Sequence, residues 1–258
     1  MFNYKFIFCL IAGLILFSSS LIFAQGKIGA RVKYVHDGDT IGVVLDDEAS
    51  SDFGSSKYRK IRFLGIDTPE TNFSANGNNY EPQEYGIEAT DSLKALLPFK
   101  AHVTLELSGK TLDDSQDKYG RILAFVILDD KDHLETLGFD EPVNTNLFLV
   151  SYGLAAPFMI YPGFLYIEEF YQACEYAINN ELNMWNPEAP IEWLPFEYRA
   201  IKRGGKKNWH YYVGDIRDFK AYSPEAYWDY VRENISPKYR VYFFNSNDVE
   251  ESDFEIAF

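Results

Sequence analysis

Residues 57–70 read KYRKIRFLGIDTPE, and this stretch joins a strand pattern to a run of polar side chains. Over residues 58–66 basic and apolar side chains alternate, which is typical of a strand with one face toward a core and the other toward solvent. The strand pattern then gives way to Asp67, Thr68 and Glu70. Polar residues at a strand end are held by a rigid scaffold yet reach solvent, so this segment is a candidate site.

Four further strands are predicted around this stretch, followed along the chain by helices. The order of five short strands, with one helix between the third and fourth and two helices after the fifth, favours a five-stranded OB-fold-type β-barrel with three flanking helices, of the α+β class. We expect the other strands at residues 28–35, 40–46, 101–107 and 121–128, and the helices at 85–97, 144–152 and 164–182.

The composition of the sequence changes after residue 185, where several prolines mark a linker. We therefore predict a barrel domain over residues 25–189 and a small C-terminal α+β module of unknown role over residues 190–258. The module contains the basic run KRGGKK at 202–207 followed by aromatic residues, which suits either added nucleic-acid contacts or a solvated loop before a buried strand.

Two carboxylates at different strand ends suggest a cation site. Asp39 follows the first strand in the turn HDGD, and Asp67 follows the third strand, with the backbone carbonyl of Thr68 beside it. Hard oxygen ligands of this kind suit Ca²⁺, with water and substrate phosphate completing the coordination shell.

A base and two arginines accompany these carboxylates. Glu70 lies three residues after Asp67 across a rigid proline, and is positioned to act on a water as a general base. Arg62 and Arg121 belong to neighbouring predicted strands, and guanidinium groups bind phosphate oxygens in pairs and stabilise charge that develops on them. A metal ion, a general base and two arginines are together the groups that a phosphodiesterase needs.

Each segment also has a simpler interpretation when taken alone. Asp-Gly is a common hairpin turn, so residues 36–39 need no catalytic role. Residues 67–70 read equally well as the start of a helix with proline in its first turn. Arg62 alone would pass for a surface charge on a strand. The specificity of the signal comes from the three segments occurring in order, each at a strand boundary.

The chain resembles the staphylococcal nuclease (thermonuclease) family of Ca²⁺-dependent nucleases over residues 29–185. The resemblance extends from the three segments to YGIEA at 85–89, LVSYGLA at 149–155 and LNMW at 182–185. It implies hydrolysis of DNA and RNA phosphodiester bonds with little sequence specificity. Carried over by position, it implies these roles: metal ligands Asp39, Asp67 and Thr68, general base Glu70, phosphate-binding Arg62 and Arg121, and an aromatic flanking the nucleotide, Tyr119.

The sequence departs from the family pattern in a few places. The loop at residues 47–57 is longer than a tight hairpin, and residues 132–143 insert extra chain before the second helix. Met159 stands where the family places an aromatic residue toward the substrate, and the nearby Tyr161 is our candidate for that contact.

The first 24 residues indicate export. Lys5 precedes an apolar run that is followed by a small residue, Ala24, which is the pattern of a cleaved signal peptide. The run is also near the length that spans a bilayer, so an uncleaved membrane anchor is the alternative. We expect a secreted or periplasmic monomer that needs no stable protein partner and meets a membrane only if the segment stays uncleaved.

The charge of the chain runs against a nucleic-acid substrate. The 258 residues carry a formal net charge of −15 at pH 7. Most of the acidity lies in residues 25–189, which hold 27 acidic and 13 basic residues. Phosphate backbones attract basic surfaces, so substrate binding should depend on the cation and on local basic residues. Two alternatives to a nuclease stay open: a non-catalytic nucleic-acid- or protein-binding module, because the same fold also occurs with its catalytic residues lost, and an exported adhesion or assembly protein in which the aromatic C-terminal module matters most.

Overall fold

The computed structural model describes residues 26–48, 53–158 and 166–257. The predicted leader, residues 1–24, and Tyr161 lie outside these ranges. Among the described residues, no helix has the length and apolar character needed to cross a bilayer.

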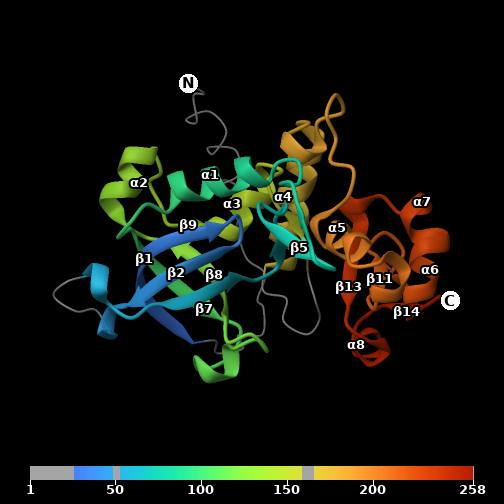
Figure 1. Ribbon diagram of the computed structural model, residues 1–258, viewed down its shortest axis with the longest axis horizontal. Coiled ribbons are helices and arrows are strands. Elements are labelled where there is room, and N and C mark those ends of the chain that lie inside the picture. The colour runs from blue at the N-terminus through green and yellow to red at the C-terminus, as the bar shows by residue number, and fades with distance from the viewer. Residues whose placement is uncertain (1–25, 49–52, 159–165, 258) are drawn as a thin grey trace.

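A closed barrel of five strands forms the first part of the molecule (Figure 1). The antiparallel neighbours run in the order β3-β2-β1-β7-β8, and a parallel pairing of β3 with β8 closes the barrel. The prediction of a five-stranded OB-fold-type barrel is therefore confirmed. The strands are β1 (Lys27–Asp37), β2 (Thr40–Leu45), β3 (Arg59–Phe63), β7 (His102–Leu107) and β8 (Ile122–Leu128).

Apolar side chains from these strands fill the barrel interior. All six residues of β2 are buried, and Val32, Ile61, Leu105 and Val126 from the other strands are fully shielded from solvent. Burial of large aliphatic side chains stabilises a fold by about 1.5–3 kcal/mol for each, so the barrel is a rigid support for the loops at its ends.

Four helices flank the barrel, one more than the sequence predicts. The predicted three are α1 (Gly86–Leu96), α3 (Thr145–Ser151) and α4 (Ile167–Asn179). The fourth, α2 (Lys131–Leu137), lies within the segment interpreted as an insertion. Asp130 caps it by accepting a hydrogen bond from the His133 backbone N–H at 3.3 Å, and Gly138 ends it in the left-handed region.

Short strands also occur where the sequence suggests loops. The polar stretch after Thr68 contains the hairpin of β5 (Phe73–Ala75) and β6 (Asn78–Tyr80). The pair of β4 (Ile66–Asp67) and β10 (Ala156–Pro157) holds Asp67 opposite Ala156. A strand of two residues, β9 (Val143–Asn144), extends the main sheet beside β8.

The C-terminal segment forms a second, smaller sheet with short helices, as predicted. The strand order is β13-β11-β12-β14, and the final stretch of the chain forms a strand, a short acidic helix and a strand. The sheet strands are β11 (Tyr212–Asp215), β12 (Lys220–Tyr222), β13 (Arg240–Phe243) and β14 (Glu255–Ile256), and the helices are α5 (Pro195–Lys202), α6 (Pro224–Ala226), α7 (Arg232–Asn234) and α8 (Ser246–Glu250). A π-helical turn, Tyr227–Val231, lies between α6 and α7.

The C-terminal segment packs directly against the barrel part. One hydrophobic cluster joins Ala156 and Met184 to Phe196, Trp209 and Tyr242. In Figure 1, α5 lies beside β5, between the barrel and the C-terminal sheet. Polar contacts reinforce this packing, because the side chain of Gln83 donates to the Trp193 carbonyl at 2.5 Å and the hydroxyl of Tyr85 donates to the Ala189 carbonyl at 2.5 Å. The exact division between the two parts stays a prediction.

Candidate active site

Asp39 occupies the turn that joins β1 to β2. The turn has two residues, Gly38 and Asp39, and the Asp39 backbone N–H donates to the Asp37 carboxylate at 3.2 Å. One carboxylate oxygen of Asp39 accepts from the Thr40 hydroxyl at 3.1 Å, and the other accepts from the Thr68 backbone N–H at 3.1 Å. These bonds fix the buried Asp39 carboxylate so that it faces the segment after β4.

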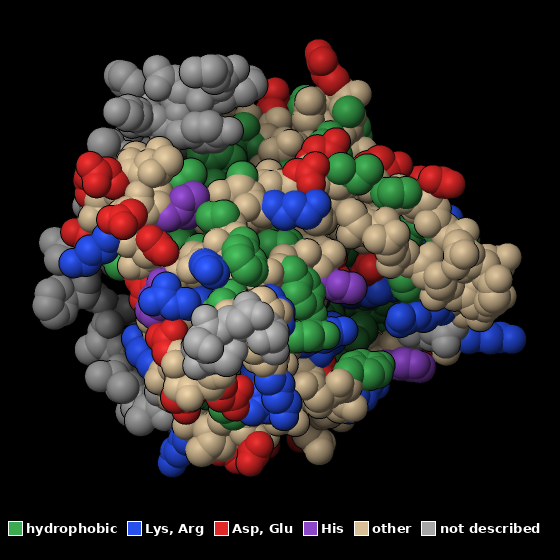
Figure 2. All heavy atoms as spheres, turned by 60° about the vertical axis from the view of Figure 1, so that its left-hand side comes forward, with side chains coloured by type: hydrophobic (Ala, Val, Ile, Leu, Met, Phe, Trp, Pro, Cys, Tyr) green, Lys and Arg blue, Asp and Glu red, His purple; other side chains and the backbone are tan. Residues whose placement is uncertain are grey.

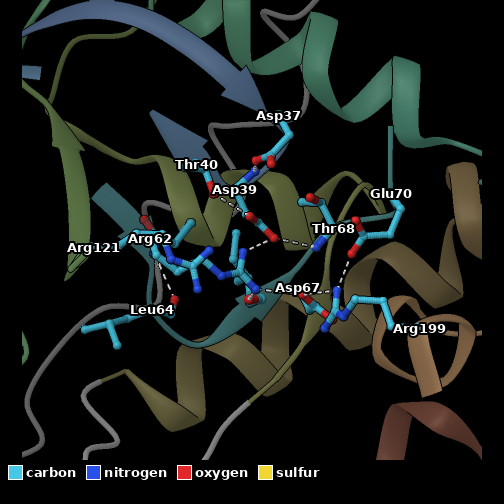
Figure 3. Close-up of polar contacts among 12 residues, drawn as sticks. Asp37, Asp39, Thr40, Arg62, Leu64, Asp67, Thr68, Glu70, Arg121 and Arg199 are labelled. Carbon is cyan, nitrogen blue, oxygen red and sulfur yellow. Dashed lines mark hydrogen bonds and ion pairs between the residues drawn. The ribbon is translucent and has the colours of Figure 1, made fainter. Parts of the chain in front are cut away.

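Asp67 is fully buried at the end of β4. Arg62 links it to Asp39: one terminal nitrogen of the guanidinium is ion-paired with Asp39 and the other donates to Asp67 Oδ1 at 2.6 Å. The register explains this arrangement, because Arg62 on β3 pairs with Thr40 on β2, next to Asp39. The hairpin turn and the strand end therefore bring both carboxylates to one arginine (Figure 3).

Glu70 lies beside Asp67 on a loop fixed by backbone contacts. Its N–H donates to the Gln83 side chain at 3.3 Å, and its carbonyl accepts from the Gln83 N–H at 2.8 Å. Burial raises the pKa of the Glu70 carboxyl above its usual value; the nearby Arg199 opposes this rise and the Asp67 carboxylate adds to it. A raised carboxyl pKa favours a general base over a permanently charged surface group.

Arg121 and Tyr119 lie at the edge of the cluster. The turn before β8 is built on Asp117, whose carboxylate accepts from the backbone N–H of Tyr119 at 2.9 Å and from Arg121 Nε at 2.8 Å. The Tyr119 ring is 73% exposed, and the Arg121 guanidinium lies 5.6 Å from its centre. Because β3 and β8 are neighbours, Arg121 stands on the Arg62 side of the site.

The structure brings most of the predicted site residues together. Asp39, Thr68, Asp67 and Arg62 form one contact network, Glu70 joins it through Arg199 on α5, and Arg121 lies at its border. Tyr161 lies outside the described residues. The catalytic, metal-binding and substrate-binding roles given to these residues stay predictions.

The sequence analysis missed one member of the network, Arg199. It comes from α5, and its guanidinium binds Asp67 through two nitrogens, at 3.1 Å and 2.6 Å, and Glu70 at 2.5 Å. The Asp67 contact spans 132 positions of sequence. Arg199 stands in PFEYRAIK, an ordinary amphipathic helix start, and no local pattern there points to a site in another part of the chain.

The donor set fits a hard divalent cation in its chemistry. Asp39 and Asp67 present oxygens to a shared position, and the structure shows that a cationic group, the Arg62 guanidinium, already binds both. Over the described ranges, however, no three Asp, Glu, His or Cys side chains converge as a complete metal cage. The described residues would thus offer few ligands themselves, and water and substrate phosphate would supply the others.

One face of the molecule carries mixed charge, with Lys and Arg side chains interspersed among Asp and Glu (Figure 2). A shallow hollow next to Arg121 has basic and aromatic walls, which are suited to a phosphate backbone and a stacked base. Its lining residues are Tyr58, Arg59, Lys60, Gln116, Tyr119, Gly120, Arg121 and Ile122.

Comparison with known proteins finds nucleases. The family model of the staphylococcal nuclease homologues matches residues 60–187. The chain is 32% identical over 156 residues to the thermonuclease of Staphylococcus hyicus, covering 60% of this chain and 75% of that protein.

Two Bacillus subtilis (strain 168) endonucleases are also similar. Endonuclease YncB is 32% identical over 151 residues, which cover 58% of each chain. Endonuclease YhcR is 30% identical over 237 residues, which cover 90% of this chain but only 17% of that protein. The YhcR similarity thus includes much of the C-terminal segment. The barrel topology, the network around Asp67 and these matches agree, and the chain belongs to the staphylococcal nuclease family.

Proposed function

We propose that this protein is a Ca²⁺-dependent endonuclease that hydrolyses phosphodiester bonds of DNA and RNA with little sequence specificity. The observation that carries the proposal is the convergence of Asp39, Asp67, Glu70 and Arg62 at one end of a closed barrel. The nuclease relatives support the same reaction class.

Glu70 is proposed to take a proton from the attacking water. Its carboxylate is only partly exposed and its pKa is raised, so it accepts a proton more readily than an ordinary surface carboxylate does. The two-way backbone and side-chain contact with Gln83 holds the Glu70 loop in place. Correct placement of a base contributes to the rate together with its basicity.

Arg62 and Arg121 are proposed to bind the phosphate. Both are planar donors, Arg62 on β3 and Arg121 in the turn just before the neighbouring β8. Carboxylates anchor both, Arg62 by Asp39 and Asp67 and Arg121 by Asp117. Such donors stabilise the negative charge that grows on phosphate oxygens as water attacks. Asp39, Asp67 and the Thr68 carbonyl would hold Ca²⁺, which supplies polarisation of the phosphate when bound.

Little sequence specificity is expected from the chemistry of the exposed groups. Tyr119 offers a ring face to any base, and Lys60 and Arg121 offer charge to any phosphate. Stacking on a ring and contacts with phosphates form with any base sequence. Sequence specificity would need further donors and acceptors directed at the base edges. We therefore expect a random-oligonucleotide pool to be cut without strong preference.

The test is digestion of plasmid DNA and RNA by the purified full chain with Ca²⁺ and then with EGTA. Activity that persists unchanged in EGTA contradicts the cation assignment, and absence of cleavage in both conditions favours a non-catalytic binding module. Glu70→Gln should lower kcat by about 10²–10⁴-fold, and Arg121→Ala by about 10²–10³-fold. Glu88→Gln on the exposed face of α1 and the surface variant Arg31→Ala are the matched controls and should cleave like wild type.

We also propose that the protein is exported. The support is the N-terminal sequence, in which a lysine precedes an apolar run ending in a small residue. Expression of the full chain in a bacterial host, followed by N-terminal sequencing of the medium and membrane fractions, distinguishes a cleaved leader from an anchor. Recovery of the uncleaved protein from the cytosol contradicts export.

A further inference from the structure

Arg199 places a positive charge from the C-terminal segment inside the candidate active site. Its side chain is 21% exposed and binds the fully buried carboxylate of Asp67 through both terminal nitrogens. One of these nitrogens also binds Glu70 at 2.5 Å. Figure 3 shows Arg199 reaching the carboxylates from the side opposite Arg121.

The helix that carries Arg199 is held firmly in place. Glu197, two residues earlier on α5, is buried and ion-paired with the buried Arg240 at 2.6 Å, and it also accepts a hydrogen bond from the Tyr227 hydroxyl. On the opposite side, the Tyr198 hydroxyl donates to the Glu81 carbonyl at 3.3 Å. Because the two residues before Arg199 are fixed by tertiary contacts, its position does not depend on the salt bridge alone.

The oxygens of Asp67 are already engaged by arginines. Oδ1 accepts from Arg62 at 2.6 Å and from Arg199 at 3.1 Å, and Oδ2 accepts from Arg199 at 2.6 Å. A divalent cation that binds Asp67 would therefore replace hydrogen bonds of Arg199 and experience its charge. The same guanidinium keeps the carboxylates of Asp67 and Glu70 close together, although two such like charges repel each other.

We propose that Arg199 is a positioning residue of the active site, an internal counter-ion that holds Asp67 and Glu70 together in the absence of a divalent cation and competes with that cation for Asp67. The C-terminal segment thereby sets the cation concentration that the site requires. The inference rests on the proposed function in assigning the cation to Asp39 and Asp67.

The experiment is a calcium titration of the full chain by isothermal calorimetry, with the thermal unfolding temperature measured in parallel. Arg199→Gln removes the charge and keeps hydrogen-bonding groups. It should lower the Kd for Ca²⁺ by at least about tenfold. In the wild type the guanidinium groups of Arg62 and Arg199 both repel a cation at Asp67, whereas only Arg62 does so in the variant, and this difference is appreciable even at the dielectric constant of water. Arg199→Lys keeps the charge but loses the planar guanidinium, so its Kd for Ca²⁺ should lie between those of wild type and Arg199→Gln.

Lys202→Gln is the matched control. Lys202 lies one turn further along α5, and its ammonium group stands over the rings of Tyr80 and Tyr198 instead of the carboxylates. The variant loses the same formal charge from the same helix, so a Kd within about twofold of wild type separates the local competition from a general change in net charge.

The outcomes decide between the alternatives. A Kd for Arg199→Gln that equals or exceeds that of Lys202→Gln overturns the proposal, as does a lack of Ca²⁺ binding by wild type and Arg199→Gln alike. Binding by Arg199→Gln where wild type binds weakly supports it. If Arg199→Gln fails to fold, the Kd of Arg199→Lys decides, and a value at or above that of wild type overturns the proposal. Nuclease assays on the same samples test the proposed function separately, because cation affinity is read without substrate.

Discussion

Gly38 shows how a single side chain shapes the candidate site. A Cβ atom at this position would lie 2.7 Å from the Thr68 hydroxyl oxygen and 2.8 Å from Thr68 Cβ. Folded proteins do not show such short contacts, so the hairpin turn or the Thr68 segment has to move. The glycine is thus required by the close approach of two chain segments that hold Asp39 and Asp67.

Gly38→Ala should therefore reduce both activity and stability. We expect kcat/KM on a single-stranded oligonucleotide to fall by about tenfold or more, and urea unfolding to show a loss of about 1–3 kcal/mol. Gly77→Ala, in an open turn with φ +78° and nothing within 4 Å of the added methyl group, is the control that should lose stability without losing activity. Wild-type turnover by Gly38→Ala would refute the argument.

His102 gives the protein a pH-dependent contribution to stability. Its two ring nitrogens contact Asp129 at 2.5 Å and Asp46 at 2.9 Å. Burial by itself lowers the pKa of His102, but hydrogen bonds to the two carboxylates outweigh burial and raise it above the usual value. A folded-state pKa above the unfolded value of about 6.5 means that the charged form stabilises the fold.

His102→Gln should therefore be more destabilising at pH 6 than at pH 9. The contribution of His102 is fully present below its unfolded pKa and disappears as the pH rises through its folded pKa. We expect a loss of about 1 kcal/mol in the free energy of unfolding at pH 6, measured by urea titration. His210→Gln, at an exposed position, is the control and should stay within about 0.5 kcal/mol of wild type; equal losses for His102→Gln at both pH values would exclude the effect.

At the scale of elements, α5 connects the stability of the C-terminal segment to the candidate site. Its N-terminal turn is closed by Glu197, whose second carboxylate oxygen accepts from the Leu194 N–H at 3.0 Å. Arg240, the partner of Glu197, also donates to the Ile235 carbonyl from Nε at 2.8 Å. Both members of the Glu197–Arg240 pair therefore make further hydrogen bonds to the backbone. Removal of the charge of one member leaves the buried charge of the other uncompensated.

Glu197→Gln should consequently destabilise the fold by about 3–5 kcal/mol. Chemical denaturation of the full chain measures this loss, and Glu192→Gln at an exposed position of the same segment should stay within about 0.5 kcal/mol of wild type. The calcium affinity of Glu197→Gln should move toward that of Arg199→Gln, since a displaced α5 withdraws Arg199 from Asp67. A stable Glu197→Gln variant would show that the pair does not hold the helix.

The elements of the barrel were largely predictable and the small ones were not. The strands β1 and β8 are long enough to carry a sequence signal: β1 has partly alternating polar and apolar residues, and β8 is a continuous run of seven apolar residues. The hairpin of β5 and β6 has three residues in each strand, too few for a period. Its place is fixed by tertiary contacts instead, such as the Asn76 side chain donating to the Lys202 carbonyl at 3.2 Å.

At the scale of the whole molecule, the net charge of −15 should govern substrate binding. An acidic protein repels polyanions over distances longer than those of individual contacts. The basic side chains on the face in Figure 2 lie among acidic ones. Binding to nucleic acid should therefore be weak without a divalent cation.

Fluorescence anisotropy with a labelled single-stranded oligonucleotide checks this expectation. In EDTA at moderate salt the protein should bind in the range of about 10⁻⁴ M or weaker, below the usual non-specific affinity of basic DNA-binding proteins. Ca²⁺ added to the inactive Glu70→Gln variant should tighten binding without cleavage. Tight binding in EDTA would show that the mixed-charge surface is sufficient by itself.

The sequence by itself determined the barrel, three of its flanking helices and the placement of Asp39, Asp67, Glu70, Arg62 and Arg121 near strand boundaries. These features are local: a period of two or 3.6 residues, or a polar run where a strand ends, is written in consecutive residues. Only the tertiary structure decided that α5 delivers Arg199 to Asp67 and Glu70. That contact joins surfaces far apart in the chain and is selected by the packing of Phe196, Trp209 and Tyr242 against the barrel part, an outcome of the whole core that no short stretch of residues encodes.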